Sequence, residues 1–261
     1  MTGQLRLAGV FAHPDDDAYG IGGTIALERD RVEVSIVLAT SGDAGEISDP
    51  SLATRENLGE VREGEERAAL RALGVPGAPV HFLRYPDGGM KDADRPALVD
   101  RLAGVLAEVR PDVVVTFGPE GVTKHDDHVT VSQAATEAFH RARAEAGDGL
   151  QRLFYVAIPK SGIDQFWELL RARGVDIGDP EGPFMPRGVP DEAITVRVDC
   201  RSVMDTKLEG IKAHATQWTE FGMIPPEMQE RMLSEEWFVQ AWPPVTEPAG
   251  SMAASLFEGL R

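Results

Sequence analysis

Short apolar runs alternate with longer amphipathic stretches along most of this chain. The apolar runs are continuous and rich in β-branched residues, and they predict strands over residues 5–11, 32–39, 80–83, 113–117 and 154–158. Between them, apolar residues at helical spacing predict helices over 24–29, 55–73, 96–109 and 125–146. Further along, a strand-like run over 195–200 precedes a helix predicted over 201–217.

The alternation of wholly apolar strands with helices indicates a parallel sheet that is buried on both faces. We therefore predict an α/β protein with a three-layer, Rossmann-like fold, in which helices cover both faces of a mostly parallel sheet. No repeat or linker divides the 261 residues, so we expect a single domain over 1–261.

Two later segments differ from this pattern. The segment near 174–190 is rich in Gly and Pro, which predicts a surface loop or a lid, with disorder as the alternative. The segment 218–248 carries three of the four tryptophans, so it either packs as core against the sheet or forms the apolar wall of a binding cleft.

Charge and composition narrow the classes of partner. The formal net charge of −17 argues against nucleic acids and anionic membranes as partners, because both would be repelled. No run approaches the roughly 18 apolar residues of a membrane span, and no leader-like segment opens the chain. The single cysteine, Cys200, suits a reducing compartment and is expected to be a buried, inert thiol. We expect a soluble, cytoplasmic protein.

The stretch His13-Pro14-Asp15-Asp16-Asp17 directly follows the first predicted strand. Three adjacent carboxylates repel one another and are costly to hold together unless a cation lies among them. The alternative is a solvated acidic turn that caps the next helix. A second cluster of His and Asp, residues 125–128 after the fourth strand, favours a built site.

These two clusters have the composition of a catalytic metal site. Ligands of open parallel sheets bind at the carboxyl ends of the strands, where both clusters lie. A catalytic zinc ion uses three protein ligands and leaves a fourth position for water. Two histidines and one carboxylate, His13, His128 and Asp16, can supply such a set. For the second cluster alone, exposed histidines beside a helix cap are the alternative.

The neighbouring residues suggest catalytic roles. Asp15 is placed to accept a proton from a metal-bound water. His125 could stabilise an oxyanion or protonate a leaving nitrogen, and Asp127 could hold its ring.

The first cluster, followed by Gly22-Gly23-Thr24, resembles the signature of the PIG-L/LmbE family of zinc-dependent N-acetylglucosaminyl deacetylases. That signature ordinarily reads His-Pro-Asp-Asp-Glu, and the second one, usually His-Pro-Asp-His, appears here as His-Asp-Asp-His over 125–128. Flanking pieces at 40–45, 62–75, 86–89, 116–119 and 212–217 also match. The resemblance covers most of the chain and is weakest over about 141–195.

The resemblance implies one Zn²⁺ per chain, or another divalent ion, with His13, Asp16 and His128 as ligands. It implies a general base at Asp15 and an acid or oxyanion-stabilising group at His125, oriented by Asp127.

Two further positions match residues that hold sugar hydroxyls in the mycothiol-pathway deacetylase of this family, namely Arg62 and Asp87. For Arg62 the alternative is a pair with a neighbouring Glu on its own helix. Four positions depart from the family pattern: Asp17 stands for Glu, Asp126 for Pro, Thr123 for a Tyr of the mycothiol enzyme, and Lys124 for Gly.

The function that we expect is metal-dependent removal of an N-acyl group, in the first instance acetyl, from an amino sugar or its conjugate. One alternative is an amidase that cleaves a larger amide, such as a mycothiol-type thiol conjugate. Another is a sugar-binding module without catalysis. The expected partner is a small amino-sugar substrate, and assembly into a homo-oligomer is left open.

Overall fold

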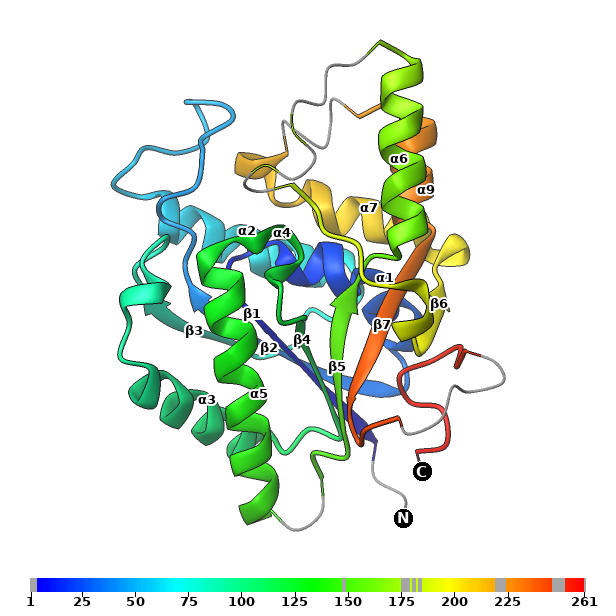
Figure 1. Ribbon diagram of the computed structural model, residues 1–261. Helices are drawn as coiled ribbons and strands as arrows, with labels where there is room; N and C mark the ends of the chain where they lie inside the picture. The colour runs from blue at the N-terminus through cyan, green and yellow to red at the C-terminus, as the bar shows by residue number, and fades with distance from the viewer. Residues whose placement is uncertain are drawn as a thin grey trace.

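A single seven-stranded sheet lies at the centre of the chain (Figure 1). The computed structural model describes residues 4–146, 149–174, 179, 182, 185–218, 224–245 and 252–260. The order of the strands is β3-β2-β1-β4-β5-β7-β6. Their bounds are β1 (Leu5–Phe11), β2 (Val32–Thr40), β3 (Val80–Tyr85), β4 (Val113–Phe117), β5 (Arg152–Ala157), β6 (Val196–Asp199) and β7 (Glu235–Trp242).

The five strands from β3 to β5 are parallel, and only β7 runs against its neighbours β5 and β6. The predicted mostly parallel sheet is therefore confirmed. β1 and β4 are wholly apolar or nearly so because helices cover them on both faces.

Helices form a layer on each side of the sheet (Figure 1). On one face α7 contacts both α1 and α2, while α3 and α5 pair on the other. The bounds of the helices are α1 (Asp16–Glu28), α2 (Leu58–Ala72), α3 (Arg95–Val109), α4 (Gly121–Lys124), α5 (Asp126–Ala146), α6 (Lys160–Ala172), α7 (Met204–Lys212) and α9 (Pro226–Leu233), with 3-10 turns η1 (Met90–Asp92), η2 (Asp191–Ala193), η3 (Arg201–Val203) and η4 (Ala215–Gln217). The predicted three-layer α/β architecture is confirmed.

The first helix begins earlier than the sequence predicted. We expected a glycine-rich turn before a helix at residue 24, but α1 begins at Asp16 and takes in these glycines. Close packing explains the glycines, because a Cβ on Gly23 would lie 2.4 Å from the Sγ of Cys200. Cys200 is buried as predicted, and burial raises the pKa of its thiol to about 12.

Two elements were missed by the sequence analysis. Helix α6 fills the interval after β5, although Ile163, Trp167 and Leu170 already recur at helical spacing there. Strand β7 occupies part of the aromatic segment 218–248, where Phe238 is fully buried. Within this segment, residues 219–223 and 246–248 lie outside the described residues.

The helix predicted over 201–217 is shorter than expected, since α7 is flanked by the 3-10 turns η3 and η4. Of the Gly- and Pro-rich segment 174–190, much lies outside the described residues. Its end is held in place: the backbone N–H of Val189 donates to the carbonyl of Ile158 over 2.8 Å, and that of Arg187 donates to Val122 over 2.6 Å.

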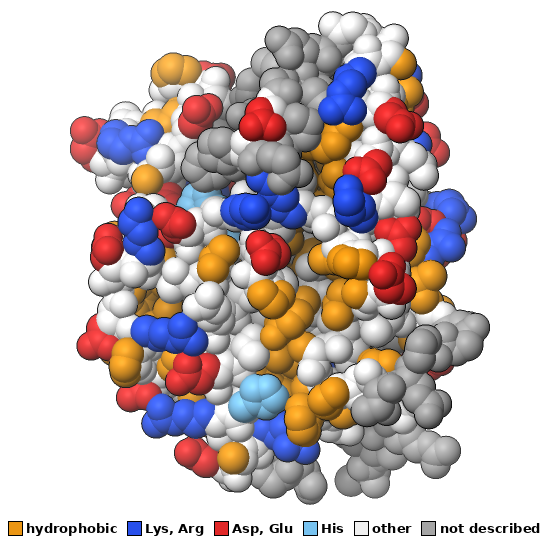
Figure 2. All heavy atoms as spheres, viewed as in Figure 1, with side chains coloured by type: hydrophobic (Ala, Val, Ile, Leu, Met, Phe, Trp, Pro, Cys, Tyr) orange, Lys and Arg blue, Asp and Glu red, His pale blue; other side chains and the backbone are white. Residues whose placement is uncertain are grey.

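On the face shown in Figure 2, acidic and basic side chains are interleaved, and hydrophobic side chains gather in the middle of the face. Among the described residues, no helix combines the length and apolar character that crossing a membrane requires.

Candidate active site

The two His/Asp clusters meet where the strand order of the sheet reverses. β1 lies between β2 and β4, and the first cluster leaves the carboxyl end of β1 while the second begins α5, shortly after β4. In open parallel sheets this crevice is the usual ligand site. The predicted convergence of the clusters at this edge is therefore what the fold produces.

Three side chains of the clusters present ligand atoms to one point. His13 Nδ1 lies 3.2 Å from His128 Nε2 and 3.5 Å from Asp16 Oδ2, and His128 Nε2 lies 3.4 Å from Asp16 Oδ1. In a tetrahedral zinc site with bonds of about 2.0–2.1 Å, ligand atoms are about 3.3 Å apart. The spacing of the two nitrogens and the two Asp16 oxygens fits a divalent metal of that size.

The opposite nitrogen of each histidine is bound by the protein. His128 Nδ1 lies 3.0 Å from the carbonyl oxygen of Gly121. His13 Nε2 lies 3.0 Å from Asp87 Oδ1 and 3.3 Å from Asp127 Oδ2. Metal-binding histidines typically donate their second N–H to a carboxylate or a carbonyl, which fixes the ring and its tautomer. This arrangement favours Nδ1 of His13 and Nε2 of His128 as the metal-facing atoms.

Other His and Asp sets are close enough to consider as ligands. His13, His125 and His128 form one such group, and His13, Asp87 and Asp127 form another. The second group uses the Nε2 side of His13, away from His128, and its carboxylates are already held by backbone amides. We prefer Asp16 to His125 as the third ligand because Asp16 approaches both metal-facing nitrogens.

The structure corrects the role expected of Asp127. We expected its carboxylate to hold the ring of His125, but the carboxylate lies on His13 and accepts N–H groups from Gly88 (2.7 Å) and Met90 (3.0 Å). Its link to His125 is made by the backbone, since the N–H of Asp127 donates to His125 Nδ1 over 3.1 Å.

Asp87 also supports His13. One of its oxygens faces His13, and the other accepts the N–H of Ala44 over 2.8 Å. Burial opposes the ionisation of Asp87, but hydrogen bonding to His13 and its charge outweigh burial and lower the pKa of Asp87 to about 2. Both oxygens already have one partner each in the protein, and the sugar-binding role predicted for this residue stays a prediction.

Arg62, for which we predict a sugar-binding role, lies against Asp15 with its side chain buried. Its Nη2 lies 3.0 Å from Asp15 Oδ2 and donates to the carbonyl of Pro14, while Nη1 donates to the carbonyl of Gly42. The pair with a Glu of its own helix, our alternative, is not what forms.

Asp15 has a backbone and an electrostatic environment that few aspartates share. Its φ is 113°, a region that costs a non-glycine residue about 1–3 kcal/mol and that clusters at functional sites. Burial raises the pKa of its carboxyl to about 7, and the guanidinium of Arg62 limits that rise. A carboxylate with a pKa near neutrality is suited to accept a proton at physiological pH.

The carboxylates of the site create a strongly negative environment. Burial opposes the ionisation of Asp16, but the charges of His128 and His13 outweigh it and lower the pKa of Asp16. Burial also opposes protonation of His13, yet hydrogen bonds to Asp127, Asp16 and Asp87 raise the pKa of His13 well above its ordinary value. A pocket that holds a proton this firmly in the protein alone has the charge to hold a divalent cation instead.

The loop that carries the second cluster is strained. Gly121, Val122 and Lys124 all have positive φ, and for the β-branched Val122 this is a rare conformation. The strain places His125 beside His13, with ring centroids 5.1 Å apart. Phe117, at the end of β4, stacks on the ring of His128 at 4.1 Å and holds it from the other side.

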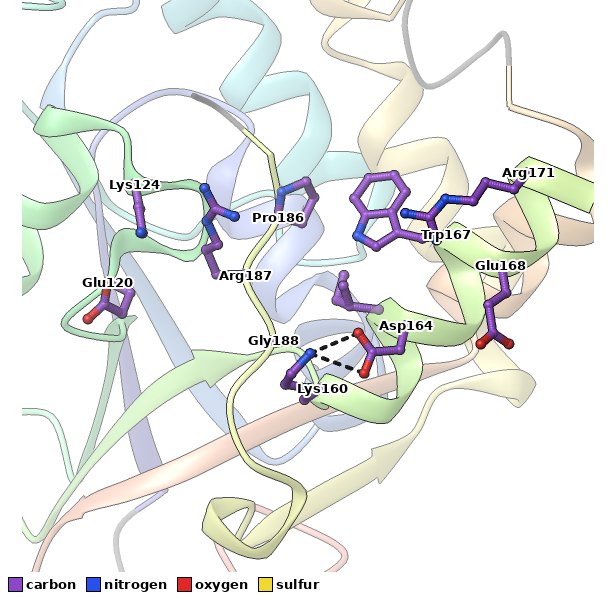
Figure 3. A pocket seen from close by; sticks show the side chains of 11 residues that line it. Glu120, Lys124, Lys160, Asp164, Trp167, Glu168, Arg171, Pro186, Arg187 and Gly188 are labelled. Carbon is purple, nitrogen blue, oxygen red and sulfur yellow. Dashed lines mark hydrogen bonds and ion pairs between the residues drawn. The ribbon is translucent and has the colours of Figure 1, made fainter. Parts of the chain in front are cut away.

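Two hollows adjoin the site. The first, of about 500 Å³, lies between the loop before His125 and α6, and its charged walls are shown in Figure 3. Lys124 and Arg187 form one wall, while the ion pair Lys160–Asp164 lies on the other. The second, of about 780 Å³, is mostly apolar, and Asp16 and His128 are among the residues that line it.

Sequence reasoning missed several contributors to this geometry. Phe117 was interpreted only as the end of a strand, and no pattern marked the Gly121 carbonyl as a partner of His128. The amides of Gly88 and Met90 lie in a turn that the sequence did predict, but backbone donors carry no residue signal.

The comparisons with known proteins identify the family of the chain. Residues 9–139 match the family model described as GlcNAc-PI de-N-acetylase (PIG-L). A 1D-myo-inositol 2-acetamido-2-deoxy-alpha-D-glucopyranoside deacetylase of Kineococcus radiotolerans is 33% identical over 251 residues, which cover 82% of this chain and 69% of that protein.

Two solved structures show the fold alone, because their sequence identity is low. N,N'-diacetylchitobiose deacetylase from Pyrococcus horikoshii superposes with a TM-score of 0.61 at 22% identity, covering 90% of this chain and 83% of its own. The 4-carboxy-2-hydroxymuconate hydratase GalB from Pseudomonas putida KT2440 gives 0.64 at 23%, covering 93% and 98%. The fold thus carries more than one chemistry, and the sequence match decides the family. The chain belongs to the GlcNAc-PI de-N-acetylase (PIG-L) family.

Proposed function

We propose that this chain is a zinc-dependent hydrolase that removes an N-acyl group, acetyl in the simplest case, from the amine of an amino sugar. The family supplies the reaction class, and the relative named above acts on an acetamido sugar attached to inositol. The observation that carries the proposal is the set of three side chains, His13, His128 and Asp16, whose facing nitrogen and oxygen atoms lie 3.2–3.5 Å apart, with Asp15 next to Asp16 in the chain. A sugar-binding module would have no use for a carboxylate with a pKa near 7.

Zinc is the metal that we propose. Two imidazoles and one carboxylate are the usual donors of catalytic zinc, and the one cysteine of the chain, Cys200, is buried on another part of the sheet and does not supply a structural site. When bound, the ion would polarise the amide carbonyl and make hydroxide available at neutral pH.

The protein groups have separate tasks in this proposal. Asp15, held by Arg62, takes the proton of the attacking water as its oxygen bonds to the amide carbon. The C–N bond then breaks, the acyl group leaves as a carboxylic acid, and the departing amine gains a proton from His125 or, in return, from Asp15. Asp87 and Asp127 fix the ring of His13 throughout.

The reaction is tested by measuring free amine release from a panel of N-acetyl amino sugars with the purified, zinc-loaded protein. Asp15→Asn should keep the metal and lose about 10²- to 10⁴-fold in rate, because an amide cannot accept the water proton. Asp30→Asn, on an exposed side chain far from the site, is the matched control and should stay at the unsubstituted rate. An Asp15→Asn protein with full activity would show that another group is the base.

The metal assignment has its own test. Zinc content of the purified protein should be about one ion per chain, and His128→Ala should abolish it. Stoichiometric metal in the His128→Ala protein would remove this residue from the ligand set.

The proposal also covers the domain organisation of the chain and its place in the cell. We propose that residues 1–261 form a single domain, supported by the one continuous sheet. We also propose action in the cytoplasm, supported by the single, buried Cys200. A homo-oligomer stays open.

A further inference from the structure

An apolar cavity extends from the metal ligands toward the β5–β7 side of the sheet. Asp16 and His128 are among its lining residues, so it opens onto the reacting centre. Its apolar lining includes side chains from elements that are distant in sequence, among them Tyr19 of α1, Phe166 of α6, Leu233 of α9 and Trp237 of β7. The charged residues Asp191, Arg231 and Glu235 also line it. A hollow of about 780 Å³ is in the range of about 300–1,000 Å³ that holds a drug-sized ligand, which far exceeds the needs of one acetyl methyl group.

The opposite side of the metal ligands is polar. Asp15 is tied by Arg62 to the loop after β2, and Asp87, from the loop after β3, accepts the N–H of Ala44. The sheet order places β2 and β3 on one side of β1, and β4, β5 and β7 on the other. The reacting centre therefore lies between a polar half and an apolar half.

An N-acyl amino sugar is likewise divided, at its amide bond, into a polar part and a less polar part. The sugar is rich in hydroxyl groups and suits the polar half, while the acyl group is the part on the other side of the bond that breaks. Matching polar with polar and apolar with apolar avoids the cost of burying hydroxyl groups without partners.

We propose that the apolar cavity holds the acyl group of the substrate, and that this group is larger and more apolar than acetyl, with about six to ten carbon atoms, which fills a hollow of this size class. The inference rests on the proposed function and specifies its substrate class. Hydrolysis is unchanged: water adds its oxygen to the acyl carbon, the C–N bond breaks, and a free fatty or arylalkyl acid leaves together with the amine.

The structure offers a position at which the cavity can be narrowed. Gly162, in the first turn of α6, lines the cavity, and a Cβ there would meet only Pro159, at 3.9 Å. Gly162→Leu therefore adds apolar volume at little steric cost and replaces a poor helix former with a good one. Gly104→Leu is the matched control, since Gly104 lies in α3, remote from the cavity, and a Cβ added there would have no neighbour within 4 Å among the described residues.

The experiment measures kcat/KM for amine release from glucosamine carrying acetyl, butanoyl, hexanoyl, octanoyl and phenylacetyl groups. We expect kcat/KM to rise about a hundredfold from acetyl to hexanoyl, because each methylene buried from water contributes up to about fourfold. Gly162→Leu should lower the value for hexanoyl and octanoyl at least about tenfold, with the value for acetyl within about twofold, because the added side chain displaces only the longer chains. Gly104→Leu should leave kcat/KM unchanged for both the short and the long acyl groups.

Other outcomes contradict the inference in distinguishable ways. If acetyl is the best substrate and longer chains lose rate, the acyl assignment fails while the proposed deacetylation stands. A gain seen only with octyl or phenyl glycosides of N-acetylglucosamine would place the apolar group on the amine side and also overturn the inference. If no member of the series releases amine, the proposed function fails and this inference fails with it.

Discussion

Two buried clusters of charged residues flank helix α1, and they satisfy their polar atoms in opposite ways. In the first cluster, Glu236 of β7 accepts hydrogen bonds from the backbone of Gly23 (2.6 Å) and Thr24 (2.9 Å), from the Thr24 hydroxyl (2.6 Å) and from Lys207 (2.8 Å). In the second cluster, Asp17 and Glu66 are as deeply buried, but among the described residues no well-formed hydrogen bond reaches their carboxyl oxygens. The backbone N–H groups of residues 15, 17 and 18 only weakly favour their ionised forms, and burial outweighs them.

In the second cluster, protonation of a carboxyl group lowers the free-energy cost of burying two acidic side chains. Two ionised carboxylates cannot bond to one another, but one proton between Asp17 and Glu66 makes such a bond. Burial raises the pKa of Asp17 to about 6, and burial with the nearby Asp17 raises that of Glu66 well above its ordinary value. His214, whose Nε2 lies 3.9 Å from Glu66, is driven the other way: burial and the charge of Arg62 lower its pKa to about 3.

The two clusters differ in hydrogen bonding because one lies inside the fold and the other lies beside the reacting centre. The Glu236 cluster joins β7, α7 and α1, well inside the fold, so its atoms could be matched for stability alone. Asp17 directly follows Asp15 and Asp16, whose positions are set by the reacting centre. Proteins commonly concentrate such unmatched groups at functional sites, where chemistry rather than stability selects the residues.

The same chemical change in each cluster tests this comparison, and the larger effect is expected at Glu236. Glu236→Gln removes the charge that faces Lys207 and leaves a buried cation without its counter-ion, which typically costs about 3–5 kcal/mol. The measurement is the free energy of unfolding from urea titration, in the presence of saturating zinc.

An exposed pair provides the control. Glu33→Gln breaks the surface ion pair with Arg6 and should cost less than about 1 kcal/mol. A Glu236→Gln protein that loses no more than this control would mean that the buried pair contributes no more than a surface one.

The meeting of the two His/Asp clusters was predictable because the sequence carries their signals directly. Parallel strands bring their carboxyl ends to one edge, so the clusters after β1 and β4 had to lie close together. The contacts behind them were not predictable. The carboxylate of Asp127 lies on His13 because the turn at Gly88 and Met90 presents two N–H groups to it, and that depends on loop conformation.

The contacts of Arg62 and the strand β7 could not be predicted, for a related reason. The sequence places Arg62 on a helix, but how far that helix is rotated over the sheet decides whether the guanidinium meets solvent or Asp15. In β7, the strand opens with two glutamates, and only the tertiary partners of Glu236 make a buried charge there acceptable.

The second prediction uses the pH dependence of stability. His214 stays neutral in the folded chain down to about pH 3, whereas in the unfolded chain it takes up a proton near the ordinary histidine pKa of 6.5. Between these values only the unfolded state binds this proton, so this histidine makes stability rise with pH, by up to about 1.4 kcal/mol per pH unit. Above about pH 6.5 this contribution is constant.

His214→Gln should remove that slope between about pH 4.5 and 6.5, a change of about 2–3 kcal/mol across the interval, measured by urea titration at several pH values. Asp17 contributes with the opposite sign, because its raised pKa makes stability fall as pH rises through the same interval. The variant should therefore lose stability with rising pH. His140→Gln, on an exposed ring, is the matched control, and a His214→Gln slope equal to that of the control would show that the ring is not buried neutral.

The smallest change in the free energy of unfolding is expected for a substitution in the second cluster, at Glu66. Glu66→Gln makes the same change as Glu236→Gln, at an equally buried position, but burial and the nearby Asp17 raise the pKa of the Glu66 carboxyl well above its ordinary value and so favour its neutral form, which the amide resembles. The amide can donate an N–H to Asp17 in place of the acid O–H, so the free energy of unfolding at about pH 7 should change by less than about 1 kcal/mol. A loss of about 3 kcal/mol or more, the cost of breaking a matched buried charge, would show that Glu66 is ionised and matched by donors, in which case the two clusters would be alike. Zinc content and deacetylation rate, measured on the same protein, would then show whether the substitution also disturbs Asp15 and the active site or affects stability alone.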